Sequence, residues 1–165
     1  MINFLHSHGM HNNKDSQVKV IFVPCYLDGN DGIFDMSYYD LLIGNDLAVY
    51  PSYYEPWGYT PLEAVAFHVP CITTSVSGFG MWANKELGRA SKIQDGVEVI
   101  VRNDYNFSEV VDNVLTSIAQ YSSLDSKKQD AVRKKAAKLA EKALWKHFIS
   151  YYYEAYNIAL NNRNK

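Results

Sequence analysis

Two glutamates, Glu55 and Glu63, lie eight residues apart in the segment PSYYEPWGYTPLEA (residues 51–64), with Gly58 between them. Carboxylates accept hydrogen bonds from hydroxyl groups, and free backbone N–H groups at the start of a helix bind phosphate. Gly58 would let a phosphate approach the backbone, while the prolines of the segment restrict the loop before any ligand arrives. The segment therefore predicts a site for a ligand whose hydroxyl-rich ends are joined by a pyrophosphate, as in a nucleotide sugar.

The elements that position this segment alternate between strands and helices. Short apolar runs, typical of buried strands, occur at residues 18–23, 47–52, 69–74 and 97–101. Helix-sized segments lie between them, at residues 37–45, 60–68 and 80–88, and two or three further helices are predicted after residue 106. Alternation of this kind predicts an α/β fold, with a Rossmann-like parallel sheet, right-handed crossovers, flanking helices and closing C-terminal helices.

The glutamate segment connects the second predicted strand to a helix. In an open parallel sheet this connection lies at the carboxyl edge of the strands, where ligands bind. Thr60 and Glu63 also have the spacing of a capping box, with Pro61 at the first helical position. Helix capping and ligand binding are compatible roles for Glu63, whereas Glu55 precedes the cap and has no comparable structural explanation.

Length and composition limit the class of protein. The chain has 165 residues, 47% of them hydrophobic, and a net charge of −2, so we expect one domain over residues 1–165, with loose ends at 1–17 and 161–165. The small net charge argues against a nucleic-acid partner, and no apolar stretch is long enough to span a membrane. Cys25 and Cys71 are interpreted as reduced packing residues, and a cytoplasmic protein is expected. The histidines at the N-terminus are interpreted as incidental, and no metal site is predicted.

Three motifs together resemble the donor-site signature of retaining GT-B glycosyltransferases: PSYYEPWGYTP, the following VPCITTSVSGFG (residues 69–80) and the preceding VKVIFVPCYLDGND. Within this class the sequence is most similar to the glycogen synthases of the animal and fungal type. The resemblance implies that the chain is a fragment of the C-terminal, nucleotide-sugar-binding domain. Since it begins with Met1 followed by a mid-domain segment, an engineered fragment is expected.

The resemblance also implies roles for individual residues. Glu55 would be the catalytic residue, facing the donor glucose near its 3-hydroxyl group, and Glu63 would bind the ribose hydroxyls. Tyr38 would stack on the uracil, with Tyr39 as the competing candidate. The loop that receives the sugar and the distal phosphate would consist of four residues: Trp57, Gly58, Tyr59 and Thr60.

The implied reaction is transfer of glucose from UDP-glucose, or ADP-glucose, to a glucan acceptor, with retained configuration and without a metal ion or other cofactor. The acceptor would bind through a separate N-terminal domain, and the full-length protein could form an oligomer. The fragment alone is predicted to be inactive. Two alternatives remain open: a retaining GT-B glycosyltransferase with a lipid or small-molecule acceptor, and a non-catalytic module that binds a nucleotide or a protein partner.

Overall fold

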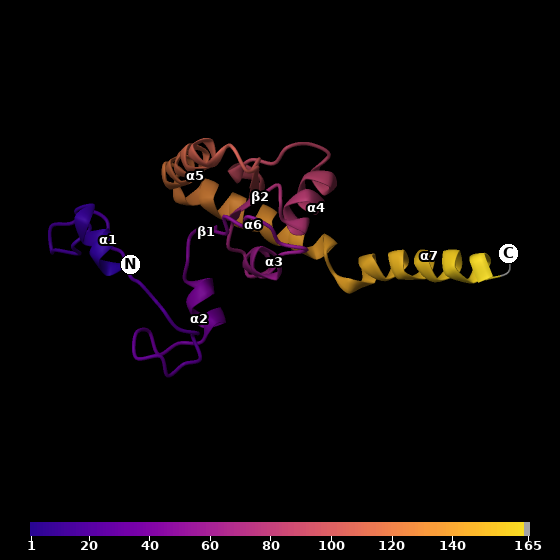
Figure 1. The fold of residues 1–165 in the computed structure, drawn as a ribbon, viewed down its shortest axis with the longest axis horizontal. Helices are drawn as coiled ribbons and strands as arrows, with labels where there is room; N and C mark the ends of the chain where they lie inside the picture. Colours follow the sequence, from indigo (N-terminus) through magenta and orange to yellow (C-terminus); the bar gives the residue numbers. More distant parts are fainter. Residues whose placement is uncertain (164–165) are drawn as a thin grey trace. The chain divides into compact units, whose positions relative to one another are not determined.

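The computed structural model of the protein describes residues 1–163 and contains two compact units: unit 1, residues 1–41, and unit 2, from residue 42 onward. Figure 1 follows the chain through its helices and strands. Unit 1 contains the short helix α1 (Ile2–Ser7) and an antiparallel bridge between Asp28 and Ser37, after which α2 (Tyr38–Ile43) begins.

The first predicted strand, residues 18–23, is wrong: this segment is irregular, and Val18, Ile21 and Phe22 are exposed. A strand requires backbone partners on a neighbouring strand. Here the Asn12 side chain, and not a neighbouring strand, pairs with the backbone of the segment. It accepts a hydrogen bond from Val20 N at 2.8 Å and donates one to Val20 O at 2.6 Å.

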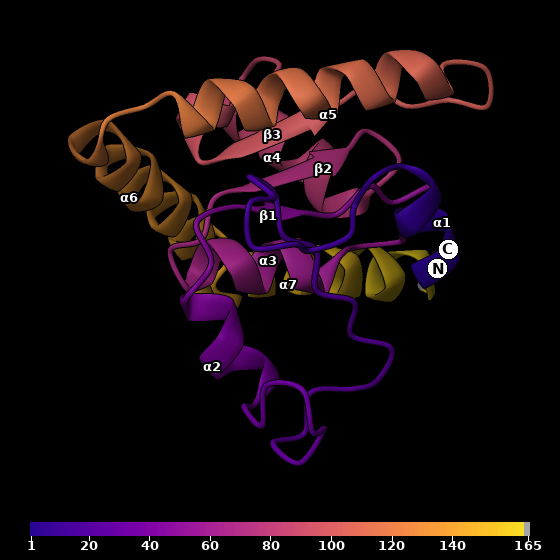
Figure 2. The same ribbon diagram turned by 90° about the vertical axis from the view of Figure 1, so that its left-hand side faces the viewer.

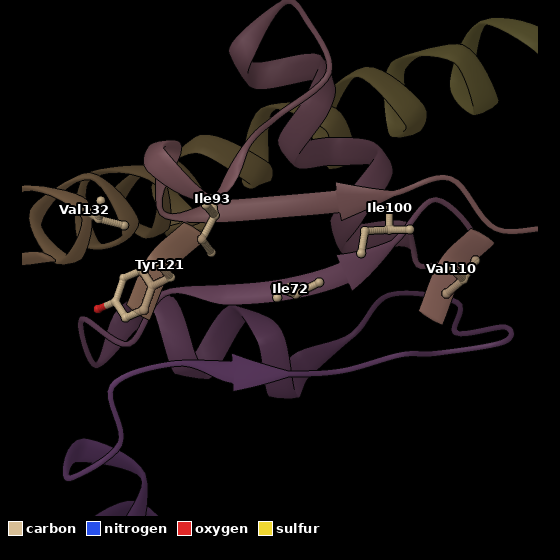
Figure 3. Packing of buried hydrophobic residues seen from close by; sticks show 6 residues of the cluster. All are labelled: Ile72, Ile93, Ile100, Val110, Tyr121 and Val132. Carbon is tan, nitrogen blue, oxygen red and sulfur yellow. The ribbon is translucent and has the colours of Figure 1, made fainter. Parts of the chain in front are cut away.

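Unit 2 contains a parallel three-stranded sheet in the order β1 (Ala48–Val49), β2 (Cys71–Thr74) and β3 (Val97–Ile100). Figure 3 shows the three arrows pointing the same way. The last three predicted strands are thereby confirmed, as is the α/β class. Strand β1 is shorter than predicted because the chain turns after Tyr50, whose carbonyl accepts a hydrogen bond from Ser52 N at 2.8 Å.

Helices connect and close the sheet. They are α3 (Tyr59–Ala66), α4 (Gly78–Leu87), the 3-10 turn η1 (Ile93–Asp95), α5 (Phe107–Ser122), α6 (Ser126–Lys142) and α7 (Trp145–Arg163). The ends expected to be loose are in part helical, since α1 occupies residues 2–7 and α7 continues through residues 161–163. Residues 164–165 lie outside the described part. From residue 1 to residue 163, no helix combines the length and apolar character needed to cross a membrane.

Both faces of the sheet are covered, as the apolar strand sequences predict. Ile72 and Ile100 point toward one face, where they pack with residues of η1, α5 and α6: Ile93, Val110, Tyr121 and Val132 (Figure 3). On the other face, Cys71 Sγ lies 3.8 Å from the Pro61 carbonyl oxygen of α3. Figure 2 shows α5 and α3 lying along different sides of the strands. The alternation of side chains along β2 thus fixes both helix layers.

Gly96 and Gly88 test how closely α6 packs on the turn before β3. Both have positive φ, +89° and +68°, but a Cβ at Gly96 would lie 2.3 Å from Ala136 N, whereas a Cβ at Gly88 would meet no atom within 4 Å. Gly88→Ala should lower the free energy of unfolding by about 1 kcal/mol through backbone strain alone. Gly96→Ala should lower it by at least about 2 kcal/mol more, because the backbone of α6 must move. Urea unfolding measures both, and equal losses would contradict the close approach.

Candidate functional site

The loop of residues 51–58, here called the elbow, connects the end of β1 to the start of α3. Because the three strands are parallel, their carboxyl ends share one edge of the sheet, and the elbow lies at that edge with the connections that follow β2 and β3. The predicted location of the glutamate segment, between a strand and a helix at the carboxyl edge of the sheet, is thereby confirmed. Ligands of open parallel sheets bind at this edge.

Glu55 is fixed from two directions. Its backbone N–H donates to Val76 O at 3.1 Å and its carbonyl accepts from Gly78 N at 3.0 Å, so the residue is paired with the connection after β2. The Ser52 hydroxyl donates to Glu55 Oε2 at 2.9 Å. The side chain is half-buried. A carboxylate held in this way keeps its place before a ligand arrives, which favours binding.

Helix α3 begins at Tyr59 with Gly58 as its N-cap, so the predicted capping box of Thr60 and Glu63 is wrong. Gly58 has φ +110°, a conformation that favours glycine, and this lets the helix start two residues earlier than predicted. Pro61 still lies in the first turn, where the N–H that proline lacks would have no helical partner. Glu63 is then half-buried on α3, one turn inside the helix.

Trp57 packs inside an aromatic cluster rather than at the surface of the elbow. Its ring lies 6.2, 5.9 and 5.7 Å, between centroids, from three other rings: Phe79 and Trp82 of α4 and Phe148 of α7. Its carbonyl accepts hydrogen bonds from Phe79 N at 2.6 Å and from the Ser77 hydroxyl at 2.9 Å. Trp57 therefore anchors the elbow to the helices behind it.

The remaining predicted residues are less closely grouped. Tyr59 and Thr60 are exposed in the first turn of α3, next to Gly58. Tyr38 belongs to unit 1, where its ring lies 5.3 Å from that of Tyr39, and its stacking on a base stays a prediction. Within residues 1–163, no group of three or more histidine, cysteine, aspartate and glutamate side chains could hold a metal ion.

Arg102, directly after β3, is a part of this edge that the sequence reasoning missed. Its guanidinium donates to Pro51 O at 2.8 Å and lies 4.6 Å from the centroid of the Tyr53 ring. The Tyr53 hydroxyl donates to Asp104 at 2.6 Å, and this hydrogen bond to a carboxylate raises the pKa of Tyr53. The sequence did offer a signal for Arg102: it is a charged residue immediately after a predicted strand. Such a residue is expected at the carboxyl edge, which it shares with the elbow.

Gly78 and Gly80, in the SVSGFG motif, pack closely against other parts of the protein. A Cβ at Gly78 would lie 2.2 Å from Pro56 O, and one at Gly80 would lie 2.4 Å from Thr74 O. These glycines let α4 approach the elbow and the end of β2.

Sequence comparison agrees with this geometry. The family described as glycogen synthase matches residues 1–164. The chain belongs to the glycogen synthase family. It is 31% identical to glycogen (starch) synthase isoform 2 of Saccharomyces cerevisiae over 97% of this chain and 23% of that protein. For isoform 1 of the same yeast the identity is 33%, over 90% of this chain and 21% of the relative.

The human liver glycogen (starch) synthase is 31% identical, over 93% of this chain and 22% of its own length. The glycogen synthase family chain described here thus spans between about a fifth and a quarter of the length of the curated relatives it matches.

In this glycogen synthase family chain, Gly78→Ala should separate the elbow from α4, because the new Cβ would collide with Pro56 O. We expect a loss of about 1–3 kcal/mol in the free energy of unfolding. Hydrogen exchange should become selectively faster at the amides of Glu55, Gly78 and Phe79, whose bonds join the two loops. Gly96→Ala serves as the control, since it disturbs α6 instead. The same exchange pattern in both variants would show that Gly78 has no local role.

Proposed function

We propose that this chain binds the sugar nucleotide UDP-glucose as the donor-binding part of a glycosyltransferase that transfers glucose to a glucan acceptor. The observation that carries the proposal is Glu55, fixed by Ser52 and by the connection after β2 on a loop at the carboxyl edge of a parallel sheet. Family membership supports it, since the relatives are glycogen (starch) synthases.

Glu55 would bind the donor glucose. Its Oε2 accepts one hydrogen bond from Ser52, and a carboxylate has capacity for several more, which hydroxyl groups of the sugar could donate. The elbow backbone is held by hydrogen bonds on both sides of Glu55. Such a carboxylate could orient the sugar while the glycosidic bond breaks, without reorganisation of the protein.

The start of α3 would receive the phosphates. The first N–H groups of a helix have no partner within the helix, and its dipole favours an anion. Tyr59 and Thr60 occupy this turn and are exposed, whereas the N-cap Gly58 is buried, with Ser77 and Pro61 packed where a side chain would lie. We therefore assign the distal phosphate to the backbone N–H groups of Tyr59 and Thr60 and to the Thr60 hydroxyl, and Gly58 contributes as the N-cap that lets this turn begin.

Glu63 completes the proposed donor site of unit 2 by binding the ribose hydroxyls, and the stacking of Tyr38 on the base stays a separate prediction. The reaction would retain configuration and need no metal ion, with the departing phosphate taking the proton of the acceptor hydroxyl. We place the enzyme in the cytoplasm. The 165-residue chain alone is expected to be inactive, because one wall of a cleft cannot enclose the donor and stabilise the leaving group.

Titration of the full-length protein with UDP-glucose, UDP and ADP-glucose tests the assignments separately. Glu55→Ala should weaken the binding of UDP-glucose by about tenfold or more. It should leave the binding of UDP unchanged, because Glu55 would contact only the glucose. Glu63→Ala should weaken the binding of UDP-glucose and of UDP by a similar factor, because both ligands contain the ribose. Calorimetry gives the dissociation constants, and weaker binding of ADP-glucose would support uracil recognition.

Glu109→Ala is the matched control, since Glu109 is an exposed glutamate in the first turn of α5. It should change none of the three affinities. If Glu55→Ala and Glu63→Ala bind UDP-glucose as well as the control does, the donor site lies elsewhere.

A further inference from the structure

The backbone of Ser52, in the elbow, is fixed at both of its polar groups. Its N–H donates to Tyr50 O at 2.8 Å. Its carbonyl accepts a hydrogen bond at 2.7 Å from the hydroxyl of Thr74, the last residue of β2. Thr74 is buried, and a hydrogen bond shielded from water in this way is strong. The sheet therefore sets the position of Ser52.

The residues on either side of Ser52 are held by the connection that follows β3. Pro51 O accepts a hydrogen bond from the Arg102 guanidinium at 2.8 Å. The same guanidinium lies 4.6 Å from the centroid of the Tyr53 ring, and the Tyr53 hydroxyl donates to Asp104 at 2.6 Å. Three consecutive residues of the elbow, 51–53, are thus held by side chains from outside the elbow.

The hydroxyl of Ser52 orders a side chain, whereas serine hydroxyls in turns commonly bond to nearby backbone groups. It donates to Glu55 Oε2 at 2.9 Å. The backbone of Glu55 is fixed separately, by Val76 and Gly78, so the bond from Ser52 acts on the carboxylate. A Cβ at Gly58 would lie 3.4 Å from the same Oε2. Oε2 therefore lies against the protein, and Oε1 is the oxygen that we assign to a ligand.

We propose that Ser52 is a positioning residue for sugar transfer, because it holds the Glu55 carboxylate in the orientation that contacts the donor glucose. Thr74 and Arg102 act through Ser52. The inference rests on the function proposed above for Glu55. A carboxylate that is ordered in advance loses less rotamer freedom on binding. Its position also matters for the rate, since a displacement of about 1 Å can slow a reaction about a hundredfold.

NMR of the isotope-labelled 165-residue chain tests the positioning without any substrate. Three-bond couplings about χ1 of Glu55 should report one rotamer in the unchanged chain. They should be averaged over several rotamers in Ser52→Ala and in Thr74→Val, because each loses one hydroxyl of the network. Thr74→Ser keeps the hydroxyl and should retain the single rotamer. Couplings that stay fixed in Ser52→Ala would overturn the inference.

Kinetics of the full-length enzyme test the consequence for catalysis. Ser52→Ala should lower kcat for transfer from UDP-glucose by about tenfold or more. It should leave the dissociation constant of UDP unchanged, because UDP lacks the glucose that Glu55 would contact. Arg102→Ala should also lower kcat, but the double variant should lose no more than Ser52→Ala alone, because Arg102 acts through Ser52. Independent, additive losses would contradict this order.

Ser122→Ala is the matched control, since Ser122 is exposed on α5 and its hydroxyl donates to Ile118 O at 2.8 Å. It should change neither the couplings nor the rate. The inference is overturned if Ser52→Ala transfers glucose as fast as this control. Averaged couplings together with normal transfer in both Ser52→Ala and Glu55→Ala would place the error in the function proposed for Glu55. Fixed couplings would place it in the role of Ser52.

Discussion

The backbone hydrogen bonds between the elbow and the connection after β2 are the constraint on which the rest of the candidate site depends. They run from Glu55 N to Val76 O, from Gly78 N to Glu55 O and from Phe79 N to Trp57 O. The pairing of β1 with β2 thereby continues past the ends of both strands. This pairing requires glycine at position 78, because any side chain there would collide with Pro56 O. A loop that would otherwise lose conformational freedom on binding is instead ordered by the sheet.

The stiffness of the elbow comes largely from outside it. The ring of Trp57 is enclosed by Phe79, Trp82 and Phe148, and the Pro51 carbonyl is held by Arg102. Contacts from α4, α7 and the end of β3 thus support a segment whose own exposed groups can face a ligand. A site supported by surrounding elements in this way keeps its geometry more accurately than a free loop does. Trp57 therefore serves the fold and the site together.

The sequence predicted the parts of this fold that depend on short-range patterns. The apolar runs of β2 and β3 and the position of the elbow are such parts. The run at residues 18–23 has the same β-branched character, yet its structure depends on backbone partners that no local pattern reveals. The start of α3 was misplaced because Thr60 is a good N-cap by residue type, while Gly58 acts through a positive φ. The role of Arg102 depends on its hydrogen bond to Pro51 O, and Pro51 is distant in the chain.

Glu55 and Glu98 show two ways in which this chain places a carboxylate beside its sheet. Glu55 lies beyond the strand ends, where Ser52 and the neighbouring backbone order it and its environment can supply water or ligand. Glu98 lies within a strand, on the face where Ile72 and Ile100 form the core, and one of its oxygens is buried. An apolar residue at that position would pack without an unsatisfied acceptor, so stability alone does not explain a glutamate there.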